Sequence, residues 1–202
     1  MVRLEFQLVH TENLSMPPPI PVTLAAYNPD WPQLAVSHAE RLRVLGPTLV
    51  IVHHIGSTAV PGLAAKPIID LMPLVTDLAD LDRERWRVEA LGYHWHGELG
   101  LSGRRYCTLS DETGIRFVQL HFFKADSPHV VRHLAFRNYL RAHPKAAAAY
   151  ENEKRRARDL HPNDSHAYTD EKDAWIRNTE ATALIWFSEQ HDPAFYFRQT
   201  SN

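Results

Sequence analysis

The sequence predicts an α+β fold, a mixed sheet with flanking helices that is followed by a C-terminal helical bundle. Two observations support this prediction. Up to about residue 125, short β-branched and aromatic runs alternate with helical segments, a pattern typical of a small mixed α/β unit. From residue 126 onward, the apolar residues recur with helical spacing, and prolines start two of the segments.

We divide the 202 residues into three regions. Residues 1–20 contain a run of prolines and no helical period, so they are expected to form a flexible N-terminal extension. Residues 21–125 are expected to form the α/β core, and residues 126–202 a helical part that packs on this core. The chain is long enough to bury a core of ordinary size.

The composition excludes several classes of protein. A formal net charge of -2 and a pI near 6.7 give no electrostatic footprint of a nucleic-acid binder. The longest apolar stretches are far shorter than the roughly 18 residues of a membrane span, so no membrane association is expected. A single cysteine, Cys107, allows no internal disulfide. We therefore expect a cytoplasmic protein with a buried, structural thiol.

The individual elements follow from turn and cap signals. A short strand is expected over 22–26, and Asp30 is expected to cap a helix that ends before Gly46-Pro47. Further strands are predicted over 48–55, 67–75, 93–96, 104–110 and 115–123, the last two joined as a hairpin. Further helices are predicted from Asp77 or Asp80 to Leu91, over 128–143 and 144–160, and from Asp170 to Gln190.

The stretch from His54 to Asp70 gathers polar groups inside apolar surroundings. Gly56 and Ser57 follow an apolar strand, so backbone N–H groups come free there and can hold an anion. Lys66 ends the loop, and Asp70 lies inside an apolar run, where a carboxylate needs a partner or a metal ion. The spacing differs from that of a P-loop, because Lys66 follows a glycine by four residues and precedes a proline.

Each of these residues also has a structural interpretation. Most Gly-Ser turns only reverse the chain, and a carboxylate such as Asp70 can be satisfied by a backbone N–H or an arginine. His121 shares a strand face with Gln119 and would meet Asp70 if the two strands are neighbours; otherwise it is a core histidine. His94 and His96 alternate along a strand, and without a third ligand a polar strand face is the expected role.

Several segments resemble the GrpB family. They are Tyr27 to Pro32, His54 to Asp70, and Phe136 to Arg141. The spaced Tyr150, Lys154, Tyr168 and Lys172 are similar to the C-terminal pattern of the same family, and the resemblance covers roughly residues 22–190. It implies a nucleotidyltransferase-like fold. A related domain is fused to dephospho-CoA kinase, where it looks like an accessory unit.

The resemblance also implies roles for single residues. Gly56 and Ser57 would form the phosphate-binding turn, and Asp70 would be the first metal carboxylate. The chain departs from the pattern of the nucleotidyltransferase superfamily at Met72, where a second carboxylate would be expected. A third carboxylate would fall near Gln119 or His121, and Asn138 stands where the family commonly has Asp. Two-metal phosphoryl transfer needs enough anionic ligands to hold two ions about 3.5 to 4 Å apart.

The resulting hypothesis is an enzyme that transfers a nucleotidyl or phosphoryl group from ATP or another NTP to a small-molecule acceptor. Its catalytic pair, Asp70 and His121, would hold at most one Mg²⁺. The alternative is a non-catalytic nucleotide- or CoA-binding module that assists a partner enzyme. In both, the substrate carries phosphate or carboxylate, and the predicted binding residues are His54, Gly56, Ser57, Thr58, Lys66, Arg137, Lys154, Tyr168 and Lys172.

Overall fold

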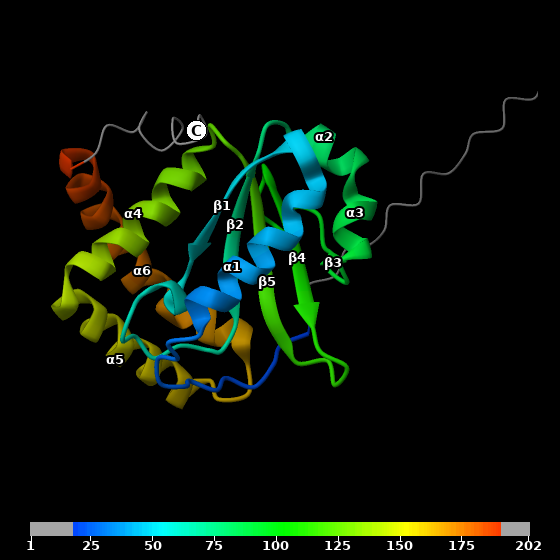
Figure 1. Cartoon of the computed structure of the whole chain (residues 1–202). Helices are drawn as coiled ribbons and strands as arrows, with labels where there is room; N and C mark the ends of the chain where they lie inside the picture. The colour runs from blue at the N-terminus through cyan, green and yellow to red at the C-terminus, as the bar shows by residue number, and fades with distance from the viewer. Residues whose placement is uncertain (1–17, 191–202) are drawn as a thin grey trace, which may run out of the picture.

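The computed structural model describes residues 18–190, and a five-stranded mixed sheet lies at its centre (Figure 1). In space the strands follow the order β1-β2-β5-β4-β3. β2 and β5 run parallel, whereas the other neighbouring pairs are antiparallel. The predicted fold class and the β4–β5 hairpin are thereby confirmed. The strands are β1 (Leu49–Ile55), β2 (Ile69–Val75), β3 (His94–Trp95), β4 (Arg104–Ser110) and β5 (Arg116–Lys124).

Three helices cover one face of the sheet (Figure 1). They are α1 (Trp31–Arg41), α2 (Leu78–Arg83) and α3 (Arg85–Ala90), and a 3-10 segment, Leu42–Thr48, leads from α1 into β1. Trp31, Leu42 and Leu81 pack there against Leu120 and Phe122 of the sheet. Burying this apolar surface is the main favourable contribution to the fold on this face.

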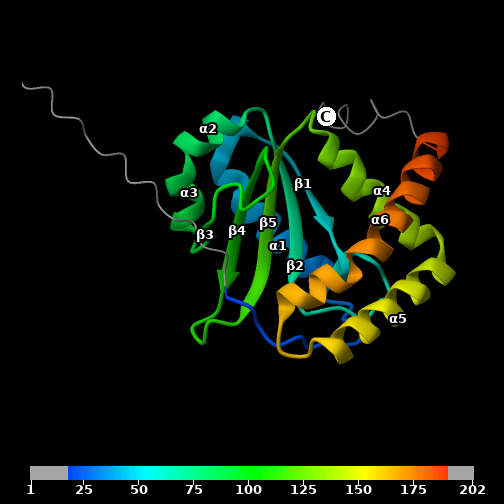
Figure 2. The same cartoon turned by 180° about the vertical axis from the view of Figure 1, so that it is seen from behind.

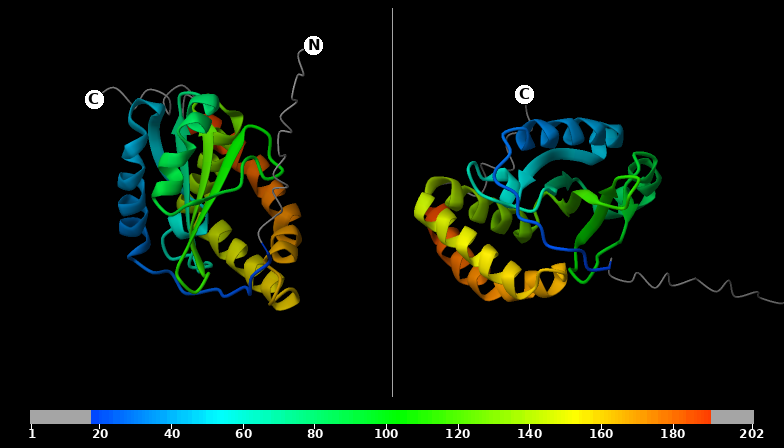
Figure 3. Two further views of the ribbon diagram at one scale, coloured as in Figure 1. Left: turned by 90° about the vertical axis from the view of Figure 1, so that its right-hand side faces the viewer. Right: turned by 90° about the horizontal axis from the view of Figure 1, so that it is seen from below.

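Two longer helices cover the opposite face (Figure 2). Met72 and Phe123 of the sheet pack against Leu134 of α4 (Pro128–Ala142) and Phe187 of α6 (Ser165–Gln190). A further helix, α5 (Pro144–Leu160), lies alongside α6 at the lower end of the sheet (Figures 2 and 3). The loop between β1 and β2 packs against α4 and α5 through Leu63, and this packing positions the candidate site.

The structure corrects four local predictions. The segment 22–26 forms only an isolated bridge between Ala25 and Ala65, because its remaining residues meet no strand. The Asp30 side chain does not cap α1. The predicted helix to Leu91 breaks at Glu84 into α2 and α3, although Asp77 caps it as expected. Finally, α6 begins at Ser165 and not at residue 170.

The start of α6 has a clear physical cause. The Asp164 carboxylate accepts hydrogen bonds from the backbone N–H groups of His166 and Ala167, at 2.9 and 3.0 Å, and so caps the first turn. Most of the predicted N-terminal extension lies outside the described residues. Ile20, near its end, donates its N–H to the Ser165 hydroxyl. Within residues 18–190, no helix combines the length and apolar character needed to cross a membrane.

Candidate functional site

The turn at the end of β1 requires a glycine for two reasons. Gly56 has a φ of 72°, in the left-handed region that side chains disfavour. A Cβ atom placed there would also overlap Oδ2 of Asp70, which lies across the β1–β2 ladder as the partner of Ile55. The turn and the carboxylate therefore touch. This explains why a glycine and an aspartate fourteen residues apart belong to one site.

A cavity of about 170 Å³, which we call the anion pocket, opens beside this turn. The β1–β2 loop, β2, β5, α5 and α6 all contribute to its walls. Eight of the predicted site residues line it together, although the sequence separates them by up to 116 positions from residue 56 to residue 172. The lining residues are Gly56, Ser57, Thr58, Lys66, Ile68, Asp70, Gln119, Tyr150, Lys154, Tyr168 and Lys172.

Three lysines of the anion pocket surround two tyrosine rings. The ammonium groups of Lys66 and Lys172 lie 5.2 and 3.8 Å from the ring centroid of Tyr168. The ammonium group of Lys154 lies 4.8 Å from the ring centroid of Tyr150 and also donates a hydrogen bond to the carbonyl oxygen of Ala64. The aromatic faces thus stabilise positive charge where few water molecules can reach it.

Burial makes these ammonium groups costly to keep charged. It lowers the pKa of Lys154 to about 7, and Glu151 only partly offsets this effect. Burial, followed by repulsion from Lys66 and Lys154, lowers the pKa of Lys172 to about 7. The pKa of Lys66 is also lowered, mainly by burial. An anion that entered the pocket would favour the charged form of all three side chains.

The two tyrosines keep their protons at neutral pH. Burial raises the pKa of Tyr150 to about 12, against a smaller opposing effect of its hydrogen bond with Ser57. Burial also raises the pKa of Tyr168. Neutral phenol hydroxyls can donate hydrogen bonds, so the walls of the pocket offer donors in addition to the ammonium groups.

Asp70 supplies the one carboxylate among the residues that line the anion pocket. Its Oδ1 lies 3.5 Å from Nε2 of His121, because β2 and β5 are neighbours as the prediction required. When the Gln119 amide nitrogen faces Asp70, it donates to Oδ1 at 3.0 Å, and the amide oxygen accepts from Arg116. The carboxylate is therefore held by the sheet, whereas His121 does not line the pocket.

These side chains do not fit a two-metal centre. Met72, two residues after Asp70, is fully buried among Leu74, Phe123 and Leu134. In residues 18–190, no three His, Cys, Asp or Glu side chains are grouped so that they could hold a metal ion. Mg²⁺ prefers several oxygen ligands, and the pocket offers it one carboxylate beside three ammonium groups.

Two predicted binding residues lie outside the pocket and hold its turn. Nε2 of His54 is 2.9 Å from the Thr58 hydroxyl, and Nη1 of Arg137 donates to the His54 carbonyl oxygen at 2.8 Å. Burial lowers the pKa of His54 to about 4, so the imidazole is neutral. Asn138, the next residue of α4, accepts a hydrogen bond from Nε of Arg137 through its side-chain oxygen.

Three residues of the lining, Ile68, Gln119 and Tyr150, were not among the predicted site residues. Gln119 follows from the register, because it is the ladder partner of Asp70. Tyr150 lies one helical turn before Lys154, so an i, i+4 pair on α5 was the available sequence signal.

His94 and His96, the alternating histidines of the sequence, lie away from the anion pocket. The centroids of their rings are 4.5 Å apart, and Nε2 of His96 is 2.9 Å from the Thr108 hydroxyl.

Comparison with known proteins places this chain among relatives of the same family. The family model described as GrpB protein matches residues 21–182. The UPF0157 protein YqkA of Bacillus subtilis is 37% identical over 166 residues, which cover 82% of this chain and 48% of YqkA. A dephospho-CoA kinase of Mycolicibacterium paratuberculosis is 30% identical over 190 residues, which cover 82% of this chain and 47% of that protein. The chain spans about half the length of these two relatives.

Solved structures agree with the sequence comparison. The crystal structure of the conserved protein GrpB from Enterococcus faecalis superimposes with a TM-score of 0.77 at 38% identity. The match covers 82% of this chain and 99% of that chain. A distant match, the Cid1 poly(U) polymerase, has a TM-score of 0.43 at 12% identity. The chain described here belongs to the GrpB family.

Proposed function

We propose that the anion pocket binds the phosphate groups of a nucleotide or of another phosphorylated small molecule, and that the chain acts as a binding module. One observation carries this proposal. Three lysines and a glycine turn converge on one small cavity that contains a single carboxylate. Buried cations without matching anions are unfavourable, and a polyphosphate would offset their charge through charge-assisted hydrogen bonds.

The size of the pocket supports a phosphate and not a whole nucleotide as its occupant. Its volume of about 170 Å³ lies below the roughly 300–1,000 Å³ of typical small-molecule sites. Ser57 and Thr58 would bind phosphate oxygens through their backbone N–H groups and hydroxyls. Lys66, Lys154 and Lys172 would offset the charge, while the rest of the ligand would lie outside the pocket.

The second candidate is transfer of a nucleotidyl or phosphoryl group from an NTP to a small-molecule acceptor. The contact between Asp70 and His121, 3.5 Å apart, favours it because a carboxylate and an imidazole together suit acid–base chemistry. One Mg²⁺, arriving with the phosphates, would be held by Asp70. Among the side chains of residues 18–190, none would support a second ion beside it.

The accessory role is supported by one of the relatives. A protein named dephospho-CoA kinase is similar to this chain over less than half of its own length, so the similar region is a part of a larger enzyme. A phosphate-binding module could present a phosphorylated ligand to such an enzyme. The proposal therefore includes a partner enzyme that receives the phosphorylated ligand from this chain.

Calorimetric titration tests the proposal with ATP, tripolyphosphate and adenosine, each with and without Mg²⁺. We expect ATP and tripolyphosphate to bind, adenosine to fail, and Mg²⁺ to be dispensable. Lys172→Gln should weaken binding about tenfold, because one ammonium group is lost. Asp70→Asn should leave binding unchanged or tighten it, because a nearby negative charge is removed. Lys145→Gln, an exposed residue of α5 outside the pocket, is the control.

Mass spectrometry of the mixtures separates the two candidates. The binding module predicts intact nucleotide after long incubation with candidate hydroxyl and carboxylate acceptors. Binding that requires Mg²⁺ and disappears in Asp70→Asn, together with a new product, would contradict the module and support the transferase. If neither ATP nor tripolyphosphate binds to the wild type, the anion pocket does not bind a polyphosphate, and the proposed binding module is wrong.

A further inference from the structure

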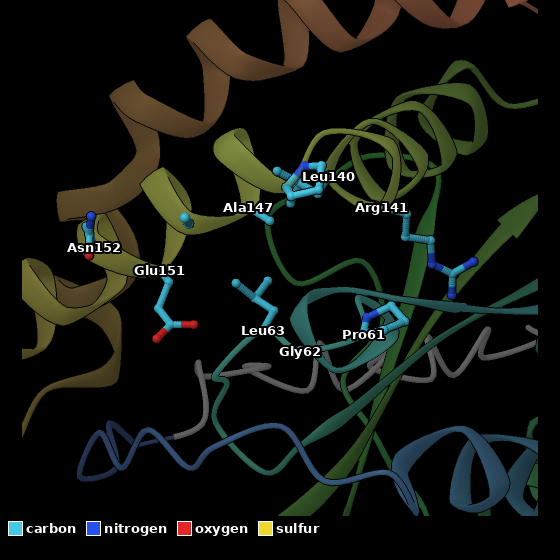
Figure 4. A pocket seen from close by; sticks show the side chains of 10 residues that line it. Pro61, Gly62, Leu63, Leu140, Arg141, Ala147, Glu151 and Asn152 are labelled. Atoms are coloured by element: carbon cyan, nitrogen blue, oxygen red, sulfur yellow. The ribbon is translucent and has the colours of Figure 1, made fainter.

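The loop that forms one wall of the anion pocket also borders a second cavity, which we call the apolar cavity. Its volume is about 580 Å³, within the range of small-molecule sites. The loop residues 61–63 form one side, and the end of α4 with the first half of α5 forms the other (Figure 4). The two cavities share no lining residue, so they are separate sites.

The floor of the apolar cavity is hydrophobic. Leu63 and Leu140 line it and are each only 2% exposed. Pro61 and Ala147 extend the same surface along the loop and along α5. An apolar ligand in the cavity would remove its own surface, and the accessible surface of Pro61 and Ala147, from water. The cavity therefore selects for a hydrocarbon body.

Two charged side chains lie toward opposite ends of the cavity, with Leu63 between them (Figure 4). The charge of Glu151 is already offset. One carboxylate oxygen accepts from the backbone N–H of Ala64 at 2.9 Å, and the other accepts from Arg155 at 2.7 Å. This carboxylate needs no further partner.

Arg141 differs from Glu151 in this respect. Its Nε donates to the carbonyl oxygen of Ala59 at 2.8 Å, which fixes the guanidinium plane without neutralising it. Among the residues that the structure describes, no carboxylate forms an ion pair with Arg141. Its two Nη groups can therefore bind a carboxylate in the bidentate manner that arginine favours.

From these contacts we infer that the apolar cavity binds a small carboxylic acid with an apolar body. The carboxylate pairs with the guanidinium of Arg141, and the hydrocarbon chain lies over Leu63 and Leu140. The inference goes beyond the proposed phosphate binding and rests on different residues. Lys172→Gln, which removes one ammonium group from the anion pocket, should leave binding of the carboxylic acid in the apolar cavity unchanged.

A series of straight-chain acids tests the inference with defined probes. Sodium butanoate, hexanoate and octanoate are titrated into the full chain by calorimetry. The Kd should fall about threefold to fourfold for each added methylene, because each one buries further apolar surface. Octanol, which has the same body without the charge, should bind at least tenfold more weakly than octanoate. Affinity that does not change with chain length would overturn the inference.

Two matched pairs of variants locate the site. Ala148→Trp places a large ring at the cavity and should reduce octanoate binding at least tenfold. Ala149, the next residue of the same helix, is also exposed but lies outside the cavity, so Ala149→Trp should bind as the wild type does. Arg141→Gln should weaken octanoate and spare octanol. Arg177→Gln, on the exposed side of α6, should affect neither.

Two results with these variants would contradict the inference. Thermal unfolding confirms that every variant is folded before its affinity is compared. If Ala148→Trp and Ala149→Trp bind octanoate equally, the acid does not occupy this cavity and the inference is wrong. If Arg141→Gln weakens the binding of octanol as much as that of octanoate, the guanidinium does not pair with the carboxylate. The inferred preference for a carboxylic acid is then wrong.

Discussion

The two sides of the anion pocket differ in what builds them. On the lysine side, Lys66 comes from the β1–β2 loop, while Lys154 and Lys172 come from α5 and α6. On the carboxylate side, Asp70 stands alone on β2, and Met72, the next residue on the same face, belongs to the core under α4. The two sides are therefore built by different elements, because a loop and two helices supply the lysines and the sheet supplies the carboxylate.

The largest expected effect on stability comes from placing a second carboxylate on the carboxylate side, at Met72. Met72→Asp should lower the free energy of unfolding by about 4 kcal/mol, because it buries an unpaired charge in an apolar cluster. Met72→Leu keeps the volume and should cost less than about 1.5 kcal/mol. Urea unfolding at pH 7 measures both. A stable Met72→Asp variant that gains Mg²⁺ binding would contradict our view of this side.

The turn that joins the two sides gives the next largest effect. Gly56→Ala combines a strained backbone with overlap against the Asp70 carboxylate, and should lower the free energy of unfolding by about 3 kcal/mol. Gly62→Ala is the matched control. Its φ of 78° is similar, but no atom lies within 4 Å of the added carbon, so we expect a loss of only about 1 kcal/mol. Equal losses in urea unfolding would show that the contact with Asp70 has no energetic role.

A substitution on the lysine side should weaken anion binding without lowering the free energy of unfolding. Lys172→Met should weaken tripolyphosphate binding at pH 7 by tenfold or more, equivalent to about 1.4 kcal/mol. The free energy of unfolding should stay the same or rise, because a buried and poorly compensated charge is removed. Calorimetry and urea unfolding give the two values, with the exposed Lys145→Met as the control. A strongly destabilised variant would mean that Lys172 has a structural role.

The pH dependence provides the most specific effect, because it depends on the titration of a single side chain. Folding lowers the pKa of Lys172 from 10.5 to about 7, so between these values the unfolded chain binds more protons than the folded chain. The free energy of unfolding should therefore rise with pH over this window, by at most about 1.4 kcal/mol per pH unit for this lysine. Below pH 7 its contribution is constant.

The lysine variant also tests this pH dependence. Urea unfolding at pH 7, 8 and 9 should show a shallower rise in Lys172→Met than in the wild type. Tripolyphosphate binding to the wild type should weaken over the same range, because the ammonium groups lose their protons. Identical slopes in the two proteins would show that folding does not lower the pKa of Lys172.

Local signals were sufficient for part of the fold. The β4–β5 hairpin follows from two strand-like runs around Asp111 to Gly114, and the starts of α4 and α5 follow from Pro128 and Pro144. The start of α6 was missed because Asp164 and Asp170 are equivalent cap residues in sequence, and only the fold decides which N–H groups need an acceptor. The break at Glu84 likewise has no proline or glycine to mark it.

The sequence by itself determined the chemical parts of the anion pocket. Gly56, Ser57, Lys66 and Asp70 lie within fifteen residues, so the strand–turn–strand pattern was enough to group them. The family resemblance had already suggested Lys154, Tyr168 and Lys172 as distant members of the site, but only the tertiary structure decided which of the predicted residues meet in one cavity. Lys154 and Lys172 face the pocket because α5 and α6 pack against the β1–β2 loop and the sheet, whereas His121 is left outside it. Burial by this packing is also what lowers the lysine pKa values, and no pattern in the chain reports burial.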